Sequence, residues 1–297
     1  MEKENLVYHY CSGDAFLSII ENNAIRMSDI TMSNDSLEIG WIIHHIRKEF
    51  DLLYNKSSVE LKSRRNCLYD FLEKFIDYYF VNTSNATEVG FVFYVACFSG
   101  GRDKLSQWRG YADDGKGFSL GFDTNMLSRM KTSQLKYYTV NYDRVTYSEH
   151  EQVAKVDEIL CDLFCQLDEL NNQWNYEGVA KTFKEAFDRL HTEAVYMKNP
   201  FFEEEKEWRL VKYHYGSNEL NDPILLVVNN SKKSDYHINF KSGDGRIISY
   251  FDLKFDKGIL KSVMLGPKNQ SSISDITLLL KRYGYDCEVD KSNGSYR

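Results

Sequence analysis

The sequence has little proline, no paired-cysteine motif and no long apolar run, and each absence narrows the class of protein. Only three of the 297 residues are proline, so the chain has no proline-rich linker of the kind that separates domains. No run reaches the roughly 18 apolar residues that a membrane-spanning helix needs. The first residues, Met1–Asn5, lack the basic and apolar regions of a signal peptide. We therefore expect a cytoplasmic protein that contacts no membrane.

The cysteine pattern is not that of a metal site. The six cysteines contain no C-x-x-C pair; they are Cys11, Cys67, Cys97, Cys161, Cys165 and Cys287. Cys161 and Cys165 are four residues apart on one face of a predicted helix, and two such thiolates could bind zinc. Zinc would need two further ligands, and no spaced cysteine or histidine supplies them. Buried free thiols are the favoured interpretation, and we expect no metal.

Charge and composition describe an acidic, aromatic-rich globular chain. The 37 basic and 44 acidic residues give a net charge of −7. This balance argues against broad electrostatic binding to nucleic acid, although it is compatible with a local basic patch. A length of 297 residues, with 21 Tyr and 18 Phe, is enough to bury a substantial core.

Apolar periodicity predicts many short strands and two long helical segments. The predicted strands are 6–10, 25–28, 91–98, 118–122, 136–147, 208–213, 224–228, 237–241, 247–255, 260–265 and 285–289. Helical spacing marks a short helix that begins at Ser12 and ends at Asn22-Asn23, two long segments at about 37–82 and 149–196, and a last helix at 276–283. The simplest interpretation is an α+β fold. Residues 1–297 would form a single domain with a central mixed or antiparallel sheet, into which the two long helical segments are inserted.

Two short motifs about two hundred residues apart indicate a functional pocket. His9 lies inside the apolar strand near the amino terminus, and the run Glu205-Lys206-Glu207 leads into a late strand. A histidine and a glutamate this far apart in sequence meet only if the fold brings them together. The alternative for His9 is a core histidine whose ring nitrogens bond backbone groups.

The acidic motif has the pattern of paired carboxylates. Alternation along a strand places Glu205 and Glu207 on one face and Lys206 on the other. Two carboxylates held close together raise one pKa, which suits general acid–base chemistry or the stabilisation of a developing cation. Arg209, on the same face as Glu207, would be its salt-bridge partner. The alternative is a solvated acidic edge of the sheet.

The segment 96–111 follows a predicted buried strand and is rich in groups that bind ligands. It contains Ser99, the glycine pair Gly100-Gly101, an indole and three cations. Arg109 or Arg102 could bind a pyrophosphate bidentately, and Trp108 could stack on a flat ring. The segment is neither a Walker A loop nor a dinucleotide-binding fingerprint. A plain loop anchored by a buried tryptophan is the alternative.

Asn34 and Asp35 follow the short strand at 25–28. Both are typical turn and N-cap residues, which is one interpretation of their position. The other is that their side chains hydrogen-bond the hydroxyls or the amide of a ligand from a rigid turn.

Several short motifs occur in a recognisable order along the chain. They are Tyr8-His9-Tyr10-Cys11-Ser12, Ile25-Arg26-Met27-Ser28, Asn34-Asp35-x-x-Glu38, Cys97-Phe98-Ser99, Gln107-Trp108-Arg109-x-Tyr111, Glu205-Lys206-Glu207-Trp208-Arg209 and Leu265-Gly266-Pro267-Lys268. In this order they resemble a widespread bacterial family known only as domain of unknown function 2971. The resemblance covers nearly the whole chain, and the family name implies no activity.

A more distant resemblance, to the ADP-ribosyltransferase superfamily, does imply an activity. It rests on a histidine-bearing first strand, the short Ile25-Arg26-Met27-Ser28 strand, a buried strand that ends in Ser99 and a late strand entered by E-x-E. The serine motif departs from the usual S-T-S, and the helical insertions are large. By this resemblance the core of the fold would be ADP-ribosyltransferase-like, and the substrate would be NAD.

The same resemblance implies a role for each site residue. His9 would bond the ribose next to nicotinamide, and Ser99 would support the nicotinamide pocket. Glu207 would hold the ribose 2′-hydroxyl and stabilise an oxocarbenium-like transition state, whereas Glu205 would activate the acceptor. The expected NAD-binding residues are Tyr10, Arg26, Asn34, Ser99, Trp108 and Arg109. One of the two arginines in this set would neutralise the pyrophosphate.

These expectations lead to one function and one alternative. The function is cleavage of NAD at the nicotinamide–ribose bond, with transfer of ADP-ribose to a protein, a nucleic acid or water. The setting that the resemblance implies is a toxin or phage-defence effector, accompanied by an antitoxin or defence-system partner. The alternative is a non-enzymatic module that binds a nucleotide or a protein through the Trp108–Arg109 segment.

Overall fold

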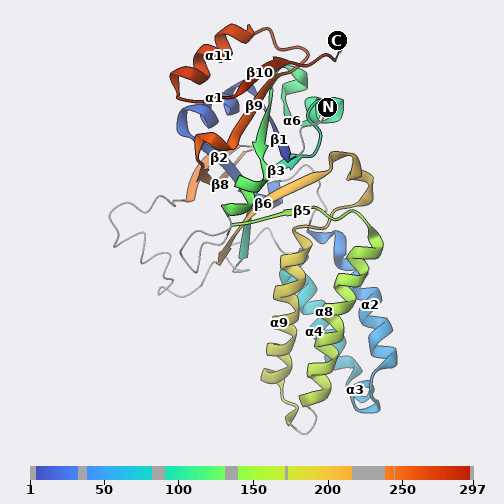
Figure 1. Cartoon of the computed structure of the whole chain (residues 1–297). Helices are drawn as coiled ribbons and strands as arrows, with labels where there is room; N and C mark the ends of the chain where they lie inside the picture. The colour runs from blue at the N-terminus through green and yellow to red at the C-terminus, as the bar shows by residue number, and fades with distance from the viewer. Residues whose placement is uncertain are drawn as a thin grey trace, which may run out of the picture.

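The computed structural model describes residues 5–32, 39–81, 91–130, 140–170, 173–215, 238–243 and 245–294. Figure 1 shows one sheet, with a helical bundle that extends below it in this view. The strands are β1 (Leu6–Cys11), β2 (Ala24–Asp29), β3 (Phe91–Ser99), β4 (Phe118–Asp123), β5 (Val140–Arg144), β6 (Glu207–Tyr215), β7 (Ile238–Gly243), β8 (Arg246–Lys254), β9 (Leu260–Leu265) and β10 (Glu288–Lys291). The helices are α1 (Gly13–Asn22), α2 (Ile43–Lys56), α3 (Val59–Ser63), α4 (Arg65–Ile76), α6 (Leu105–Tyr111), α7 (Thr124–Arg129), α8 (Glu149–Leu170), α9 (Tyr176–Ala194), α11 (Ile273–Arg282) and the short 3₁₀ segment η7 (Pro200–Glu205).

The sheet is mixed, which confirms the predicted α+β class. Its main path runs β10-β9-β4-β1-β3-β2-β8-β7, and β6 pairs with both β3 and β5. β10 is parallel to β9, whereas the other pairs of described strands are antiparallel. Helices α1 and α11 cover one face, where Phe16, Ile20 and Leu280 are buried in a common apolar core with strand residues.

The strand β3 has different neighbours along its two edges, and this difference positions the site. On one edge β6 pairs along the whole of β3, ending at Ser99↔Glu207. On the other edge β1 reaches only Ser99, through Tyr8, and β2 reaches Val95, through Ser28. Neither β1 nor β2 therefore pairs with the stretch of β3 between Val95 and Ser99. The two strands run in the same direction and separate around this stretch.

Local capping fixes α1, the connection between β1 and β2. The side chain of Ser12 accepts a hydrogen bond from the Ala15 N–H and begins the helix. Asn23 ends it in the left-handed conformation, with φ of 54°, and donates its backbone N–H to the Ile19 carbonyl. Both ends of this helix are where the sequence predicts them.

Helices α2, α4, α8 and α9 form the bundle below the sheet (Figure 1). Apolar residues at helical spacing fill its centre, and they include the fully buried Phe50, Leu68, Leu160 and Phe183. The helical segments expected at about 37–82 and 149–196 thus pack against each other. They do so although three strands, β3, β4 and β5, lie between them in the sequence.

The structure shifts the bounds of several predicted elements, including the last helix, which begins at Ile273 and not at Ile276. The segment 96–111 is expected to be a loop, but its second half forms α6, a helix too short for apolar periodicity to reveal. The last strand begins three residues later than expected, at Glu288. Tyr285, which precedes it, is buried, and its hydroxyl donates to Asn23 Oδ1 over 2.7 Å. The strand predicted at 224–228 lies outside the described residues. No helix in the described ranges is both long and apolar enough to cross a membrane.

Candidate functional site

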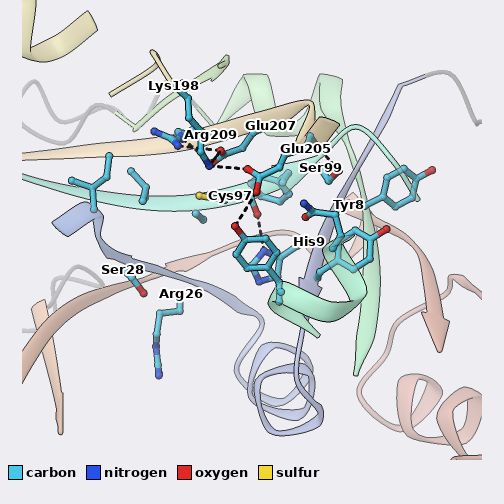
Figure 2. A pocket seen from close by; sticks show the side chains of 18 of the residues that line it. Tyr8, His9, Arg26, Ser28, Cys97, Ser99, Lys198, Glu205, Glu207 and Arg209 are labelled. Carbon is cyan, nitrogen blue, oxygen red and sulfur yellow. Dashed lines mark hydrogen bonds and ion pairs between the residues drawn. The ribbon is translucent and has the colours of Figure 1, made fainter. Parts of the chain in front are cut away.

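A cavity of about 410 Å³ lies along the gap between β1 and β2 (Figure 2). Its volume falls in the lower part of the range of small-molecule sites, about 300–1,000 Å³. Residues from β1, β2, β3, α6 and the segment 198–209 line it. The predicted site residues among them are His9, Tyr10, Arg26, Ser99, Glu205 and Glu207. The two motifs that lie far apart in the sequence therefore meet at one cavity.

The ring of His9 bridges the gap between β1 and β3. Its Nδ1 lies 2.9 Å from the carbonyl oxygen of Cys97, in the stretch of β3 that neither β1 nor β2 pairs with. A carbonyl only accepts hydrogen bonds, so Nδ1 carries the proton and Nε2 keeps a lone pair. Burial lowers the pKa of His9, which keeps the ring neutral near pH 7. One ring nitrogen of His9 thus bonds the backbone and the residue also lines the cavity, while its role in a functional site stays a prediction.

Four charged side chains form a buried network in the cavity wall (Figure 2). Arg209 binds Glu207 bidentately, with Nε–Oε1 and Nη2–Oε2 distances of 2.7 and 3.0 Å, as the sequence predicts. Lys198 Nζ lies 2.7 Å from Glu205 Oε2 and 3.1 Å from Glu207 Oε2, so it joins the two carboxylates. The side chains of Lys198, Glu207 and Arg209 are at most 6% exposed. The formal charges of the four groups cancel.

The two glutamates converge by a different route from the predicted alternation. β6 begins at Glu207, so Glu205 is not a strand residue and strand alternation does not orient it. Lys206 has a left-handed backbone, with φ of 45°, between η7 and β6. This turn places Glu205 beside Lys198 and beside Tyr111, whose hydroxyl donates to Glu205 Oε1 over 3.1 Å.

Glu207 stays ionised far into the acid range. Burial alone would raise its pKa, but the ion pairs with Arg209 and Lys198 outweigh burial and lower the pKa to about 2. The thiol of Cys97 also hydrogen-bonds this carboxylate. Against an ordinary pKa of 4.5, the shift stabilises the folded state by about 3 kcal/mol at neutral pH.

We expect the protein to lose this stabilisation as the pH falls from about 4.5 to about 2. The sign follows from the lowered pKa, because the unfolded chain takes up the proton at a higher pH than the folded protein. Glu207→Gln lacks the titrating group. The difference in unfolding free energy between wild type and this variant should therefore be largest near pH 7 and shrink across the acid window. Urea denaturation of both proteins at several pH values measures it, and a difference that does not change with pH would refute the assignment.

Ser99 and Tyr10 are held by backbone groups at the cavity wall. Ser99 Oγ donates to the Glu205 carbonyl over 2.7 Å and accepts from the Gly101 N–H over 3.2 Å. The hydroxyl of Tyr10 donates to the Gly101 carbonyl over 2.9 Å and accepts from the Lys104 N–H over 3.0 Å. Both hydroxyls therefore fix the loop that follows β3, and Ser99 ties this loop to the carboxylate segment.

Arg26 supplies a cation on the β2 side of the cavity. Its guanidinium stacks on Tyr250, 3.7 Å from the ring centroid, and its Nε donates to Asp252 over 3.2 Å. The side chain is 39% exposed and lines the cavity, so it can bind an anionic group of a ligand there. For metal ions, the described residues contain no group of three or more His, Cys, Asp or Glu side chains that could hold one.

Trp108 and Arg109 are not among the cavity residues. Trp108 is buried, its Nε1 donates to Asp103 over 2.6 Å, and Tyr10 packs edge-on against its ring. An indole enclosed in this way has no free face on which a ligand could stack. Arg109 is exposed on α6 and does not line the cavity. Asn34 lies outside the described residues.

The sequence does not mark three further residues of the cavity wall as site residues. Lys198 lies in an irregular segment between α9 and η7, where no periodicity marks it. Gln107 and Tyr111 are four residues apart, so they share one face of α6. Recognition of this short helix in the sequence would have placed both side chains together.

Comparison with known proteins matches a segment that contains much of the cavity wall. Residues 107–210 match the model of a family described as a protein of unknown function (DUF2971). The matched segment begins at Gln107 and includes Lys198, Glu205 and Glu207, and it supports the family resemblance over this part of the chain. No curated protein and no solved structure matches the chain.

Proposed function

We propose that this chain is an ADP-ribosyltransferase-like enzyme, which cleaves NAD at the nicotinamide–ribose bond and transfers ADP-ribose to a macromolecule or to water. The observation that carries the proposal is the cavity between β1 and β2, which gathers His9, Ser99, Glu205 and Glu207 from distant parts of the chain. Groups that act on one substrate must lie within reach of it, and a common cavity meets this requirement.

The proposed reaction uses the carboxylates to stabilise positive charge. The bond between ribose C1′ and the nicotinamide nitrogen breaks, and both electrons go to the nitrogen. Nicotinamide leaves as a neutral molecule, and the ribose becomes an oxocarbenium-like cation. Glu207 is ionised at neutral pH, and its charge stabilises this cation. A nucleophile of the acceptor, or water, then bonds to C1′ and passes its proton to Glu205.

Two residues on the other strands hold the substrate in place. Nε2 of His9 accepts a hydrogen bond from a ribose hydroxyl, because the contact of Nδ1 with Cys97 leaves the lone pair on Nε2. Arg26, on the β2 side, binds the pyrophosphate. Lys198 and Arg209 keep both carboxylates in one orientation through their ion pairs.

The experiment that tests the proposal uses NAD labelled separately in its nicotinamide and adenylate halves. Purified protein is incubated with each label, with and without cell lysate. We expect labelled nicotinamide to be released, and the adenylate label to appear on a macromolecule when an acceptor is present. NAD that stays intact in every lysate, including lysates of phage-infected cells, would contradict the proposal.

Arg26→Gln is expected to raise the KM for NAD about 10- to 100-fold with little change in kcat, because a charge-assisted contact with phosphate contributes about 1.5–3 kcal/mol to binding. Steady-state rates of nicotinamide release measure both constants. Arg47→Gln is the matched control, since Arg47 pairs with Glu73 on the surface of the helical bundle and is also exposed. A lower kcat with unchanged KM would place Arg26 outside the phosphate site.

One observation favours a second candidate, a non-enzymatic module that binds a nucleotide. Glu205 and Glu207 are already paired with Lys198 and Arg209. A network whose charges balance in this way is sufficient to hold the shape of the cavity without taking part in a reaction. Calorimetry distinguishes the two candidates when nicotinamide is measured in the same sample. Heat of NAD binding without release of nicotinamide would favour the binding module.

A further inference from the structure

Gln107 is a buried polar residue in the cavity wall, and its side-chain amide makes no hydrogen bond to the described part of the chain. The residue lies on α6 and is 6% exposed. The amide atoms of Gln107 are not among the side-chain atoms that are cut off from solvent without a partner, so the amide reaches the open space of the cavity. The amide of Gln107 is therefore placed for a ligand in the cavity.

Three other polar side chains that line the cavity are already bonded to the protein. Ser99 and Tyr10 bond backbone groups of the loop after β3, and Tyr111 donates to Glu205. Gln107 differs from all three because its donors and its acceptor remain for a bound molecule. Its amide is therefore available to recognise a polar group of that molecule.

The position of Gln107 indicates which end of a ligand it contacts. Tyr111 lies one helical turn further along α6 and reaches the carboxylate of Glu205, so this face of the helix borders the acidic side of the cavity. Arg26 lines the cavity from β2. A ligand with an anionic group at Arg26 would extend its other end toward Gln107 and the carboxylates.

We propose that Gln107 determines the specificity of the cavity by recognising a primary carboxamide. The amide oxygen of Gln107 accepts a hydrogen bond from the carboxamide N–H, and its NH₂ group donates to the carboxamide oxygen. Two amides paired in this way satisfy each other, which a carboxylate or a ketone cannot do with glutamine. With the proposed function, on which this step rests, the group is the carboxamide of nicotinamide.

The test compares nicotinamide with 3-acetylpyridine, a neutral analogue in which a methyl group replaces the amide NH₂. By calorimetry, wild type should bind nicotinamide about 10- to 100-fold more tightly. Gln107→Met keeps an unbranched side chain but removes the amide, so it should bind the two compounds within about threefold of each other. Equal affinities in wild type, no measurable binding of nicotinamide, or a preference that survives in Gln107→Met would each overturn the proposal.

Thermal stability separates recognition from a structural role of Gln107. Removing an amide that has no protein partner should leave Tm unchanged or raise it. Gln152 is the matched control, because it is also buried but its Nε2 donates to the carbonyls of Thr146 and Lys198. Gln152→Met should therefore lower Tm. A Gln107→Met variant that is destabilised to the same extent would show that Gln107 supports the fold instead.

The outcomes for the carboxamide subsite and for NAD cleavage are distinguishable. Gln107-dependent binding of nicotinamide, with NAD left intact, would support the subsite and overturn the proposed reaction. Cleavage of NAD and of its 3-acetylpyridine analogue with equal KM would support the reaction and overturn the subsite.

Discussion

Replacing Arg209 with methionine is expected to lower the free energy of unfolding by about 3–5 kcal/mol. Arg209 is fully buried, donates to both carboxylate oxygens of Glu207 and also donates to the Val195 carbonyl over 2.5 Å. In the variant Glu207 remains buried, with Lys198 as the cation still paired to it. A charge that has lost both water and its main partner destabilises the folded state strongly. Urea denaturation followed by tryptophan fluorescence measures the change.

A second bidentate arginine–glutamate pair, which is exposed to solvent, provides the control. Arg47 binds Glu73 bidentately at 3.0 and 2.6 Å, but both side chains are about half exposed. Arg47→Met should therefore cost no more than about 1 kcal/mol. If Arg209→Met costs as little as Arg47→Met, burial does not strengthen the Glu207 pair as proposed.

A double variant tests whether the loss of stability in Arg209→Met comes from the unpaired charge of Glu207. Glu207→Gln combined with Arg209→Met removes one charge of each sign, and Lys198 and Glu205 remain a balanced pair. The double variant should be more stable than the sum of the single effects predicts, by about 1–3 kcal/mol. Additive single effects would show that the two residues act independently.

The parts of the fold that the sequence predicts depend on local signals. Ser12 and Asn23 cap α1 through bonds to backbone groups a few residues away, so a short stretch of sequence is enough to predict both ends of the helix. The strand Leu260–Leu265 is bounded as predicted, because apolar residues stand at both of its ends and a glycine-proline turn follows it. The packing of the two long helical segments into one bundle is a long-range contact, and periodicity alone does not specify it.

The residues of the candidate site likewise divide into those that short motifs indicate and those whose position depends on long-range contacts. His9, Ser99 and Glu207 line one cavity because strand pairing brings their segments together, and the shared chemistry that the sequence suggests for them stays a prediction. The role of Lys198 could not be predicted, since it depends on the turn at Lys206 and not on any pattern around Lys198 itself.

Trp108 shows why a motif can suggest a wrong environment. Its neighbours Arg109 and Gln107 are polar, and the sequence leaves two interpretations open, a tryptophan free to stack on a ligand and a buried anchor of the loop. The structure agrees with the second, because the ring is buried in a small apolar cluster with Ala112 and Met264. Met264 belongs to β9, far along the chain, so the burial of Trp108 follows from tertiary packing that a short motif does not contain.

The largest expected loss of activity is that of Glu207→Gln, in which nicotinamide release should fall by about 100- to 1,000-fold or more. The physical reason is the loss of a fixed negative charge beside the developing cation, in a wall where water is excluded. Glu205→Gln should behave differently. Its release of nicotinamide should stay within about tenfold of wild type, while transfer of ADP-ribose to an acceptor should be lost. The two label positions in NAD measure release and transfer separately.

Loss of stability is the competing explanation for an inactive Glu207→Gln, because this substitution leaves Arg209 buried without its carboxylate partner. Phe183→Ala provides a matched control: Phe183 is fully buried in the bundle, away from the cavity wall, and its truncation costs about 3–5 kcal/mol. Assays run well below the unfolding midpoint of both variants should find Phe183→Ala active and Glu207→Gln inactive. Equal activity in the two variants would mean that Glu207 contributes to folding and not to the chemistry of NAD cleavage.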